Sequence, residues 1–497
     1  MFAVLEGEFV TGLNRRKPLL GLTAVALSMS LIAASCGRDE DKGAATTTAA
    51  STAAPSTDAP GSTAAPASSD TGSSAPGTSD APTTTAGPAK PGPGDFGTLK
   101  DVCGPGDAKG ATAQGVTDTE IVVGTTSDTG AAVVPGLNQE LFDSADAFVG
   151  WCNAAGGING RKLKLNKHDA KLFEVGARMV EACQNDFFLV GGGMALDDAS
   201  VEPMANCGMA TISAYLVGLK AGVAPLSMSP LPTSNKFNGT GILLRQVGEA
   251  DPSVITKFGE WGLQLPSVQP SAERARRAAK QYGFSEVYYE ELPTGVDNWR
   301  ALVEKLKAND VQALSMYGTA ENLATAMKTM SDVGFFPKYI VLEGNFYNDK
   351  LITEAGELLA KSNVLIYTNV VPFEEAASHP ATQQYIDLLK QFVNGAKPKS
   401  LGVNGFSAWL LFAQSVKACG SEVTRECVFE KAAAVKNWEG GGLHAETHPG
   451  PATANPPDCY TILRATPTGF VVDKELAKPN KEVFNCDPSN SKLVPEA

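Results

Sequence analysis

The spacing of apolar residues along the chain alternates between the period of a strand and that of a helix. An unbroken apolar run at 121–124 is typical of a buried strand, and apolar positions then recur at helical spacing through 141–152. Strands are predicted next at 162–165, 187–190 and 210–212, with helices at 173–183 and 199–206. In the helix at 173–183, Phe173, Ala177 and Val180 form the expected apolar face. This order predicts a parallel sheet covered by helices on both faces.

A second series of the same kind starts near Ala272. It predicts strands at 286–290, 311–316, 339–342 and 364–367, and helices at 299–308, 321–333, 381–394, 405–419 and 424–435. The segments 459–463 and 469–472 are typical of a closing hairpin. The predicted fold class is therefore α/β, with two doubly wound parallel-sheet lobes and a ligand cleft between them.

The first 36 residues have the pattern of an export signal. A cationic cluster at 15–17 precedes an uncharged apolar stretch at 19–34 that is too short and too rich in Ala and Ser to span a membrane comfortably. The stretch ends in Ile-Ala-Ala-Ser-Cys, which resembles a bacterial lipobox, although Ala33 stands where that family often has Leu. We therefore expect residues 1–35 to be a lipoprotein signal peptide and Cys36 to carry lipid. The alternative is an ordinary secretory signal, or an uncleaved anchor, with an incidental cysteine.

Within residues 36–98, the stretch from about Gly43 to Gly97 is built almost wholly from Thr, Ala, Ser, Pro, Gly and Asp. Such a composition cannot bury enough apolar surface to offset the entropy of ordering the chain. A disordered tether is predicted here, with a relaxed span of roughly 40 Å. A lipid at Cys36 would then hold the protein at the outer face of the cytoplasmic membrane.

The chain has nine cysteines, so a lipidated Cys36 would leave eight. An even number in an exported protein favours disulfides, although eight cysteines allow 105 pairings. Local spacing favours Cys419 with Cys427 and Cys459 with Cys486, and the ends of consecutive helices would bring Cys183 to Cys207. Cys103 with Cys152 follows by elimination. The sequence contains no CxxC motif, which disfavours a zinc ribbon or a thioredoxin-like site.

Composition narrows the function classes further. Hydrophobic residues make up 43% and charged residues 19% of the chain, as in a soluble globular protein. The net charge of −13 opposes binding to a phosphate backbone, so no nucleic-acid partner is expected.

One segment, 154–163 (Ala-Ala-Gly-Gly-Ile-Asn-Gly-Arg-Lys-Leu), is the most specific signal in the chain. Its two glycines end a helix, Ile158 would enter the core, and Asn159-Gly160 reverses the chain into a strand. The segment resembles the N-x-x-G-G-I-x-G-R/K turn of branched-chain-amino-acid-type substrate-binding lipoproteins of ABC transporters. The resemblance covers about 116–472.

This resemblance implies a type I, or Venus-flytrap, receptor whose two lobes are joined by three crossings and close on a ligand. The lobes are expected at 116–247 plus 371–437 and at 248–370 plus 438–490. One departure stands out: the strand that should open the second lobe, before 267–270, looks short or missing.

The resemblance also suggests where a ligand binds. The glycine-rich turn at 191–193, after a predicted strand, is a place where backbone N–H groups can hold an anion. Amino-acid receptors of the family hold the ligand carboxylate with hydroxyls in this turn and after the next strand, yet 194–198 has no Ser or Thr. Glu343 matches the position of the family's amine-binding acid. Half of the family's clamp for an amino acid is thus present and half is altered, so a standard branched-chain amino acid is not the expected ligand. The predicted contacts are Asp128, Gly192, Gly193, Met194, Asp197, Ser213, Tyr215, Tyr317, Glu343 and Phe346.

The aromatic residues and two of the acids have structural alternatives. Tyr215, Tyr317, Phe346 and Tyr347 would offer flat apolar faces to a larger or aromatic ligand, but could equally pack between the lobes or in a core. Glu343 could be a surface or capping acid, and Asp128 could cap a helix.

Enzymatic and metal sites have little support. The sequence has no G-x-S-x-G elbow, P-loop or Rossmann fingerprint. His444 and His448 are four residues apart, but glycines precede them and Pro-Gly-Pro follows, so they should not converge on one helix face. We expect a monomeric receptor without cofactor or metal that captures a small amino-acid-like or amphiphilic solute for an ABC permease. The alternatives are a flytrap sensor without transport and, more remotely, an α/β hydrolase.

Overall fold

The computed structural model describes residues 92–232, 236–451 and 456–494. The predicted signal peptide, Cys36 and the tether as far as residue 91 lie outside these residues. All described residues belong to one compact unit, Thr85–Ala497. No helix among them is both long enough and apolar enough to cross a lipid bilayer.

The first lobe is built on a parallel sheet with the strand order β2-β1-β3-β4-β5. Its strands are β1 (Glu120–Ser127), β2 (Lys162–Asp169), β3 (Phe188–Val190), β4 (Thr211–Ile212) and β5 (Ser227–Met228). The helices α1 (Gln139–Ala155), α2 (Val175–Asn185) and α3 (Val201–Cys207) connect them. The strand–helix alternation predicted for this half of the chain is confirmed.

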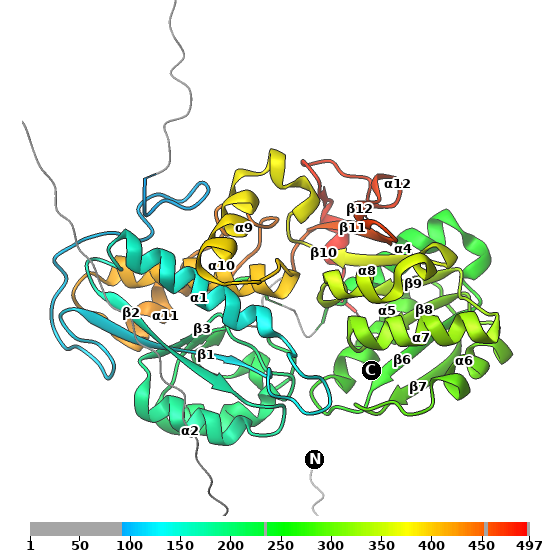
Figure 1. The fold of residues 1–497 in the computed structure, drawn as a ribbon, viewed down its shortest axis with the longest axis horizontal. Helices are drawn as coiled ribbons and strands as arrows, with labels where there is room; N and C mark the ends of the chain where they lie inside the picture. The colour runs from blue at the N-terminus through cyan, green and yellow to red at the C-terminus, as the bar shows by residue number, and fades with distance from the viewer. Residues whose placement is uncertain (1–91, 233–235, 452–455, 495–497) are drawn as a thin grey trace, which may run out of the picture. The chain divides into compact units, whose positions relative to one another are not determined.

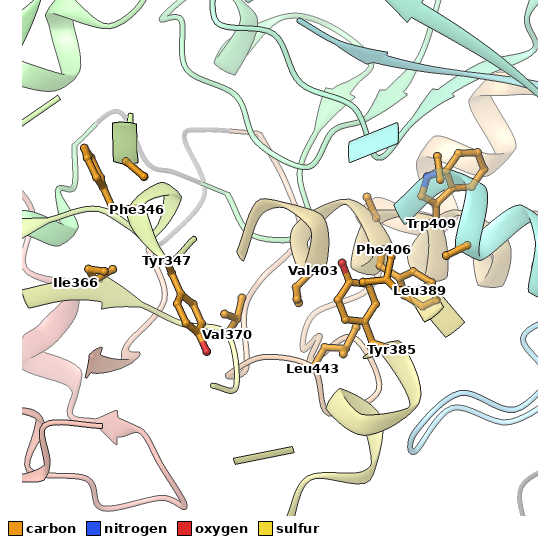
Figure 2. Close-up of a cluster of buried hydrophobic side chains, with 14 of the residues drawn as sticks. Phe346, Tyr347, Ile366, Val370, Tyr385, Leu389, Val403, Phe406, Trp409 and Leu443 are labelled. Atoms are coloured by element: carbon orange, nitrogen blue, oxygen red, sulfur yellow. The ribbon is translucent and has the colours of Figure 1, made fainter. Parts of the chain in front are cut away.

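Three later helices complete the first lobe: α9 (Pro380–Phe392), α10 (Ser400–Cys419) and α11 (Arg425–Ala433). Figure 1 shows α9 and α10 beside α1, and both contact it although they are far away in sequence. A core of aromatic rings joins them, in which Phe148 of α1 stacks on Trp409 of α10 at 5.4 Å between ring centroids. Figure 2 shows part of this core around Tyr385, Phe406 and Trp409.

The second lobe has the strand order β12-β11-β10-β9-β8-β6-β7, with β13 (Asn485–Cys486) paired to β11. Its parallel strands are β6 (Phe258–Leu263), β7 (Glu286–Leu292), β8 (Ala313–Met316), β9 (Tyr339–Leu342) and β10 (Asn363–Thr368). The antiparallel hairpin is β11 (Cys459–Thr466) and β12 (Gly469–Val472). Its helices are α4 (Gly239–Ala250), α5 (Gln269–Gln281), α6 (Trp299–Ala308), α7 (Ala320–Val333), α8 (Asp349–Ala355) and α12 (Lys474–Ala477).

The strand that opens the second lobe is present, so the expectation that it is short or missing is wrong. It is β6, and it pairs with both β7 and β8. Two glycines and Glu260 interrupt its apolar run, which is why the pattern hid it. Glu260 is buried, and burial raises its pKa well above the usual value.

The predicted lobe boundaries also need correction. The helix α4, assigned to the first lobe, contacts α5, β9 and β10 of the second. The segment 438–450, assigned to the second lobe, stays with the first: Trp438 Nε1 donates to Ser407 Oγ at 2.8 Å, and Gly450 pairs with Ser229. Amphipathic spacing shows that a helix has a buried face, but not which sheet covers that face.

The end of the predicted tether is packed as well. Phe96 is fully buried, with its ring centroid 5.0 Å from that of Phe406. Trp151 Nε1 donates to the carbonyl of Pro93 at 2.9 Å. Residues 92–98 therefore belong to the first lobe, where the buried Phe96 ring and several hydrogen bonds hold them.

The glycine turn after α1 folds as its residues predict. Gly157, at φ +87°, leaves no room for a side chain, since a Cβ there would lie 2.1 Å from the Arg161 carbonyl oxygen. Ile158 is fully buried and exchanges backbone hydrogen bonds with Arg161 at 2.8 and 3.0 Å. The chain thus reverses directly from α1 into β2.

The four predicted disulfides are confirmed: Cys103–Cys152, Cys183–Cys207, Cys419–Cys427 and Cys459–Cys486. Three of them tie together elements of the first lobe. The bond between Cys459 and Cys486 links β11 to β13 in the second lobe.

Candidate functional site

A cavity of about 360 Å³ is lined by residues of both lobes. From the first lobe come residues that follow β1 and β4, including Leu137 and Tyr215. From the second come residues that follow β8, β9 and β10, including Tyr317 and Glu343. The carboxyl ends of parallel strands are where α/β folds bind ligands, and in both sheets these ends lie at this cavity.

Most of the wall is apolar. The first lobe contributes Leu137, Leu172 and Leu216, and the second contributes Leu263, Leu265 and Met316. A cavity of about 150 Å³ can hold benzene, so 360 Å³ accepts a ligand clearly larger than a six-carbon ring.

Glu343 follows β9 and lies at the start of α4. Its Oε1 accepts hydrogen bonds from the backbone N–H of Thr240 at 3.1 Å and from the Thr240 hydroxyl at 2.8 Å. The N-terminal end of a helix favours a negative charge. Burial acts in the opposite direction and raises the pKa of the Glu343 carboxyl.

Arg274 in α5 is a cavity residue that the sequence reasoning missed. Only 6% of its surface is exposed. Its Nη2 donates to Ser271 Oγ at 2.8 Å, and its buried Nε has no hydrogen-bond partner among the described residues. Burial lowers the pKa of this guanidinium. The available signal was its place in the helix: Arg274 lies among Ala272, Ala275 and Ala278, all of them buried.

Tyr317 connects Ser271, the hydrogen-bond partner of Arg274, to Asn238 at the start of α4. Its hydroxyl donates to the carbonyl of Ser271 at 2.9 Å and accepts from Asn238 Nδ2 at 3.2 Å. Asn238 in turn caps α4 by accepting from the backbone N–H of Gly241. This network gives the second-lobe side of the cavity a fixed polar surface.

Tyr215 divides the large cavity from a smaller one. Its hydroxyl accepts from Asn138 Nδ2 at 2.7 Å, and its ring lies against Gly193, where a Cβ would come within 2.5 Å of it. Behind the ring is a cavity of about 40 Å³. Four of the predicted ligand contacts line this small cavity: Gly193, Met194, Asp197 and Ser213. None of the four is among the described residues that line the large cavity.

Gly192 and Asp128 line neither cavity among the described residues. A Cβ at Gly192 would lie 2.4 Å from the Thr126 backbone nitrogen, so this glycine permits close packing on β1. Asp128 is fully buried and accepts backbone hydrogen bonds from Leu172 at 2.9 Å and Ala195 at 2.7 Å. Both of those residues line the large cavity, so Asp128 supports its wall from behind.

Asp197 holds the loop after Tyr215 in place through backbone hydrogen bonds. Its two oxygens accept from the backbone N–H groups of Val217 and Gly218, each at 2.8 Å. Burial raises the pKa of Asp197 to about 7.

Of the two neighbouring aromatics after β9, only one is at the cavity. Phe346 lines it, whereas Tyr347 stacks on Phe373 with a centroid distance of 4.8 Å. Figure 2 shows the two rings pointing in opposite directions. Among the four predicted aromatics, Tyr215, Tyr317 and Phe346 therefore meet at the cavity and Tyr347 packs elsewhere.

The two spaced histidines serve different structural contacts. His444 is buried, with Nε2 2.8 Å from Ser407 Oγ, and burial lowers its pKa to about 4. His448 Nδ1 contacts the Lys436 carbonyl at 2.6 Å. In the part of the chain that the structure describes, no three His, Cys, Asp or Glu side chains gather as metal ligands would.

Comparison with known proteins places this geometry in context. Residues 120–469 match the family model for periplasmic binding proteins. An amino acid binding protein of Pseudomonas aeruginosa is 26% identical over 222 residues, which are 41% of this chain and 55% of that protein. The Leu/Ile/Val-binding protein homolog 1 of Brucella abortus is 24% identical over 303 residues, 58% of this chain and 76% of that protein. The chain thus spans about half the length of the first relative.

Two solved structures have the same fold. A fatty acid ABC transporter substrate-binding protein from Thermomonospora curvata superposes with a TM-score of 0.62 at 17% identity, covering 79% of this chain and 99% of its own. A branched-chain amino acid transporter substrate-binding protein of Streptococcus pneumoniae, in complex with isoleucine, gives a TM-score of 0.55 at 17% identity, covering 70% and 96%.

Proposed function

This chain belongs to the periplasmic binding protein family, and from that premise we propose that it is the solute-binding component of an ABC importer. It captures a small amino-acid-like or amphiphilic organic solute outside the cytoplasmic membrane and presents it to a permease. Lipid at Cys36 holds the protein, as a monomer, at the membrane's outer face.

The observation that carries the proposal is the cavity lined from both lobes. A ligand there touches Tyr215 of one lobe and Tyr317 and Glu343 of the other, so binding stabilises the arrangement in which the lobes approach. The relatives support the role, because each of them is named as a binding protein. One relative is named for amino acid binding and one solved structure for fatty acid transport, and the ligands proposed here include both classes.

A thermal-shift screen tests the proposal. The protein would lack residues 1–35 and carry Cys36→Ser, and the probes would be amino acids, amides, aliphatic acids and aromatic acids. A ligand at about 100 times its dissociation constant should add about 2.7 kcal/mol to the free energy of unfolding. Failure of every probe to stabilise the protein would oppose solute capture.

Glu343 offers a second test at the same site. If a ligand amine binds it, Glu343→Gln should weaken an amino-acid ligand about tenfold or more while leaving carboxylic acids without an amine unaffected. Equal loss for both ligand classes would mean that Glu343 acts through the start of α4 and not through the ligand.

A further inference from the structure

We infer that Arg274 holds a carboxylate of the ligand, and that the ligand is a monocarboxylate with an extended apolar body. This inference rests on the proposed function and specifies its substrate class. It places the acid-binding group on the second lobe, away from the glycine-rich turn of the first.

The first step is the incomplete coordination of Arg274. The side chain is 94% buried, yet Ser271 Oγ is the one hydrogen-bond acceptor that it contacts among the described residues. Among the described residues, no carboxylate forms an ion pair with it within 4.0 Å, in contrast to the neighbouring Arg276 and Arg277, which pair with Glu286 and Glu273. Glu343 acts on the guanidinium from a distance, but no anionic group of the described residues contacts it. A buried cation without direct contact to an anion is costly, and a ligand carboxylate would supply that contact.

The second step concerns the acid in the same cavity. Glu343 lines it with Arg274, but its Oε1 is engaged by the backbone and hydroxyl of Thr240 at the start of α4. Glu343 Oε1 is therefore taken up by the helix end, and the carboxylate forms no ion pair within 4.0 Å of the guanidinium, although its charge acts on Arg274 through space. The N–H edge of the Arg274 guanidinium is the part that can make a bidentate contact with an incoming carboxylate.

The third step is the state of the glycine-rich turn. Tyr215 covers Gly193, Met194 and Asp197, which line the 40 Å³ cavity behind its ring. Asp197 already takes the backbone N–H groups of Val217 and Gly218. On the first-lobe side, the large cavity meets apolar side chains such as Leu137, Leu172 and Leu216. The head of the ligand therefore belongs at Arg274 and its body against this apolar wall.

The test compares octanoate with octanamide, which has the same chain length but no charge. Calorimetric titration of the wild-type protein should show octanoate binding about tenfold to a hundredfold more tightly, as expected for a charge-assisted hydrogen bond to a buried guanidinium. Arg274→Gln should abolish this preference and leave octanamide affinity within about twofold. Arg277→Gln, on the same helix and outside the cavity lining, is the matched control and should retain the preference.

Arg274→Lys keeps a positive charge without the bidentate geometry, and should keep a reduced preference for the acid. It also serves if the glutamine variant fails to fold. Octylamine and leucine are the remaining probes. Equal binding of octanoate and octanamide to the wild type, or unchanged octanoate affinity in both Arg274 variants, would overturn the inference.

The probes distinguish failure of the Arg274 assignment from failure of the proposed solute-binding function. If leucine alone binds and Arg274→Gln leaves its affinity unchanged, solute capture stands and the assignment of Arg274 falls. If no probe, acid or neutral, binds the wild type, both fall.

Discussion

At the scale of single residues, buried carboxylates position the loops around the cavity. Asp128 accepts from Leu172 and Ala195, which lie on two different loops, and it has no exposed surface. Leu172 has a φ of +73°, a conformation that needs support from its surroundings. One side chain thus fixes two parts of the cavity wall.

We predict that Asp128→Asn lowers the free energy of unfolding by about 2 kcal/mol, because the amide can accept only one of the two backbone hydrogen bonds. Ligand affinity should fall as well, since Leu172 and Ala195 line the cavity. Denaturant titration measures the first effect and calorimetry the second. The exposed Asp332→Asn should change stability by less than about 0.5 kcal/mol. A similar result for both variants would contradict the role given to Asp128.

Asp197 should make stability depend on pH. Its folded pKa is about 7, above the 3.8 of an ordinary Asp, so the native protein keeps a proton that the unfolded chain releases. Its stabilising contribution is complete below pH about 4 and is lost as pH rises through about 7, by roughly 4 kcal/mol. Asp197→Asn should flatten this part of the stability profile. Parallel wild-type and variant profiles, measured by denaturation between these pH values, would exclude Asp197 as the source.

The candidate site was partly predictable from sequence at this scale. Tyr215, Tyr317, Glu343 and Phe346 follow strands, and that position alone brings them to the cavity. Arg274 was missed because a charge in a helix normally faces solvent, and only its alanine neighbours mark it as buried. The displacement of Met194 and Asp197 behind Tyr215 depends on loop packing, which no periodicity encodes.

At the scale of elements, disulfides should stabilise according to the loops they close. The bond between Cys103 and Cys152 spans 49 residues and that between Cys419 and Cys427 spans 8. Chain entropy predicts that replacing the first pair by Ser costs about 4 kcal/mol and replacing the second about 2.5 kcal/mol. Chemical denaturation of the two double variants tests the ranking, and a larger loss for the short loop would reverse it.

The helix α2 shows how an element can be predicted correctly and oriented wrongly. The predicted face of Phe173, Ala177 and Val180 is wrong, since Phe173 is 71% and Val180 50% exposed. The buried face is Val175, Met179 and Ala182. Two apolar stripes compete on this short helix, and the neighbouring α3, joined through Cys183–Cys207, selects the second.

At the scale of the whole molecule, the two lobes were predictable, because the spacing of apolar residues shows the order of strands and helices. The boundaries depend on which sheet covers α4 and the segment 438–450, and those contacts join residues distant in sequence. They follow only from the assembled fold.

Ligand binding should also change the protein as a whole. We expect a saturating ligand to reduce the radius of gyration in small-angle scattering, because its contacts with both lobes favour their approach. Arg274→Gln should not show the change with octanoate at the concentration that saturates the wild type. An unaltered radius in a ligand-saturated wild-type protein would argue against lobe closure.

The packing of residues 92–103 has a mechanical consequence. Phe96 is buried against α1 and α10, and Cys103 is bonded to Cys152 at the end of α1. Tension applied to the chain before residue 92 would enter the first lobe at Phe96 and be stopped by a covalent bond a few residues later. The second lobe would carry none of this load. A pull on the N-terminal region would thus act on the first lobe alone. The second lobe could still move relative to the first, and its position would depend on the ligand and not on the pull.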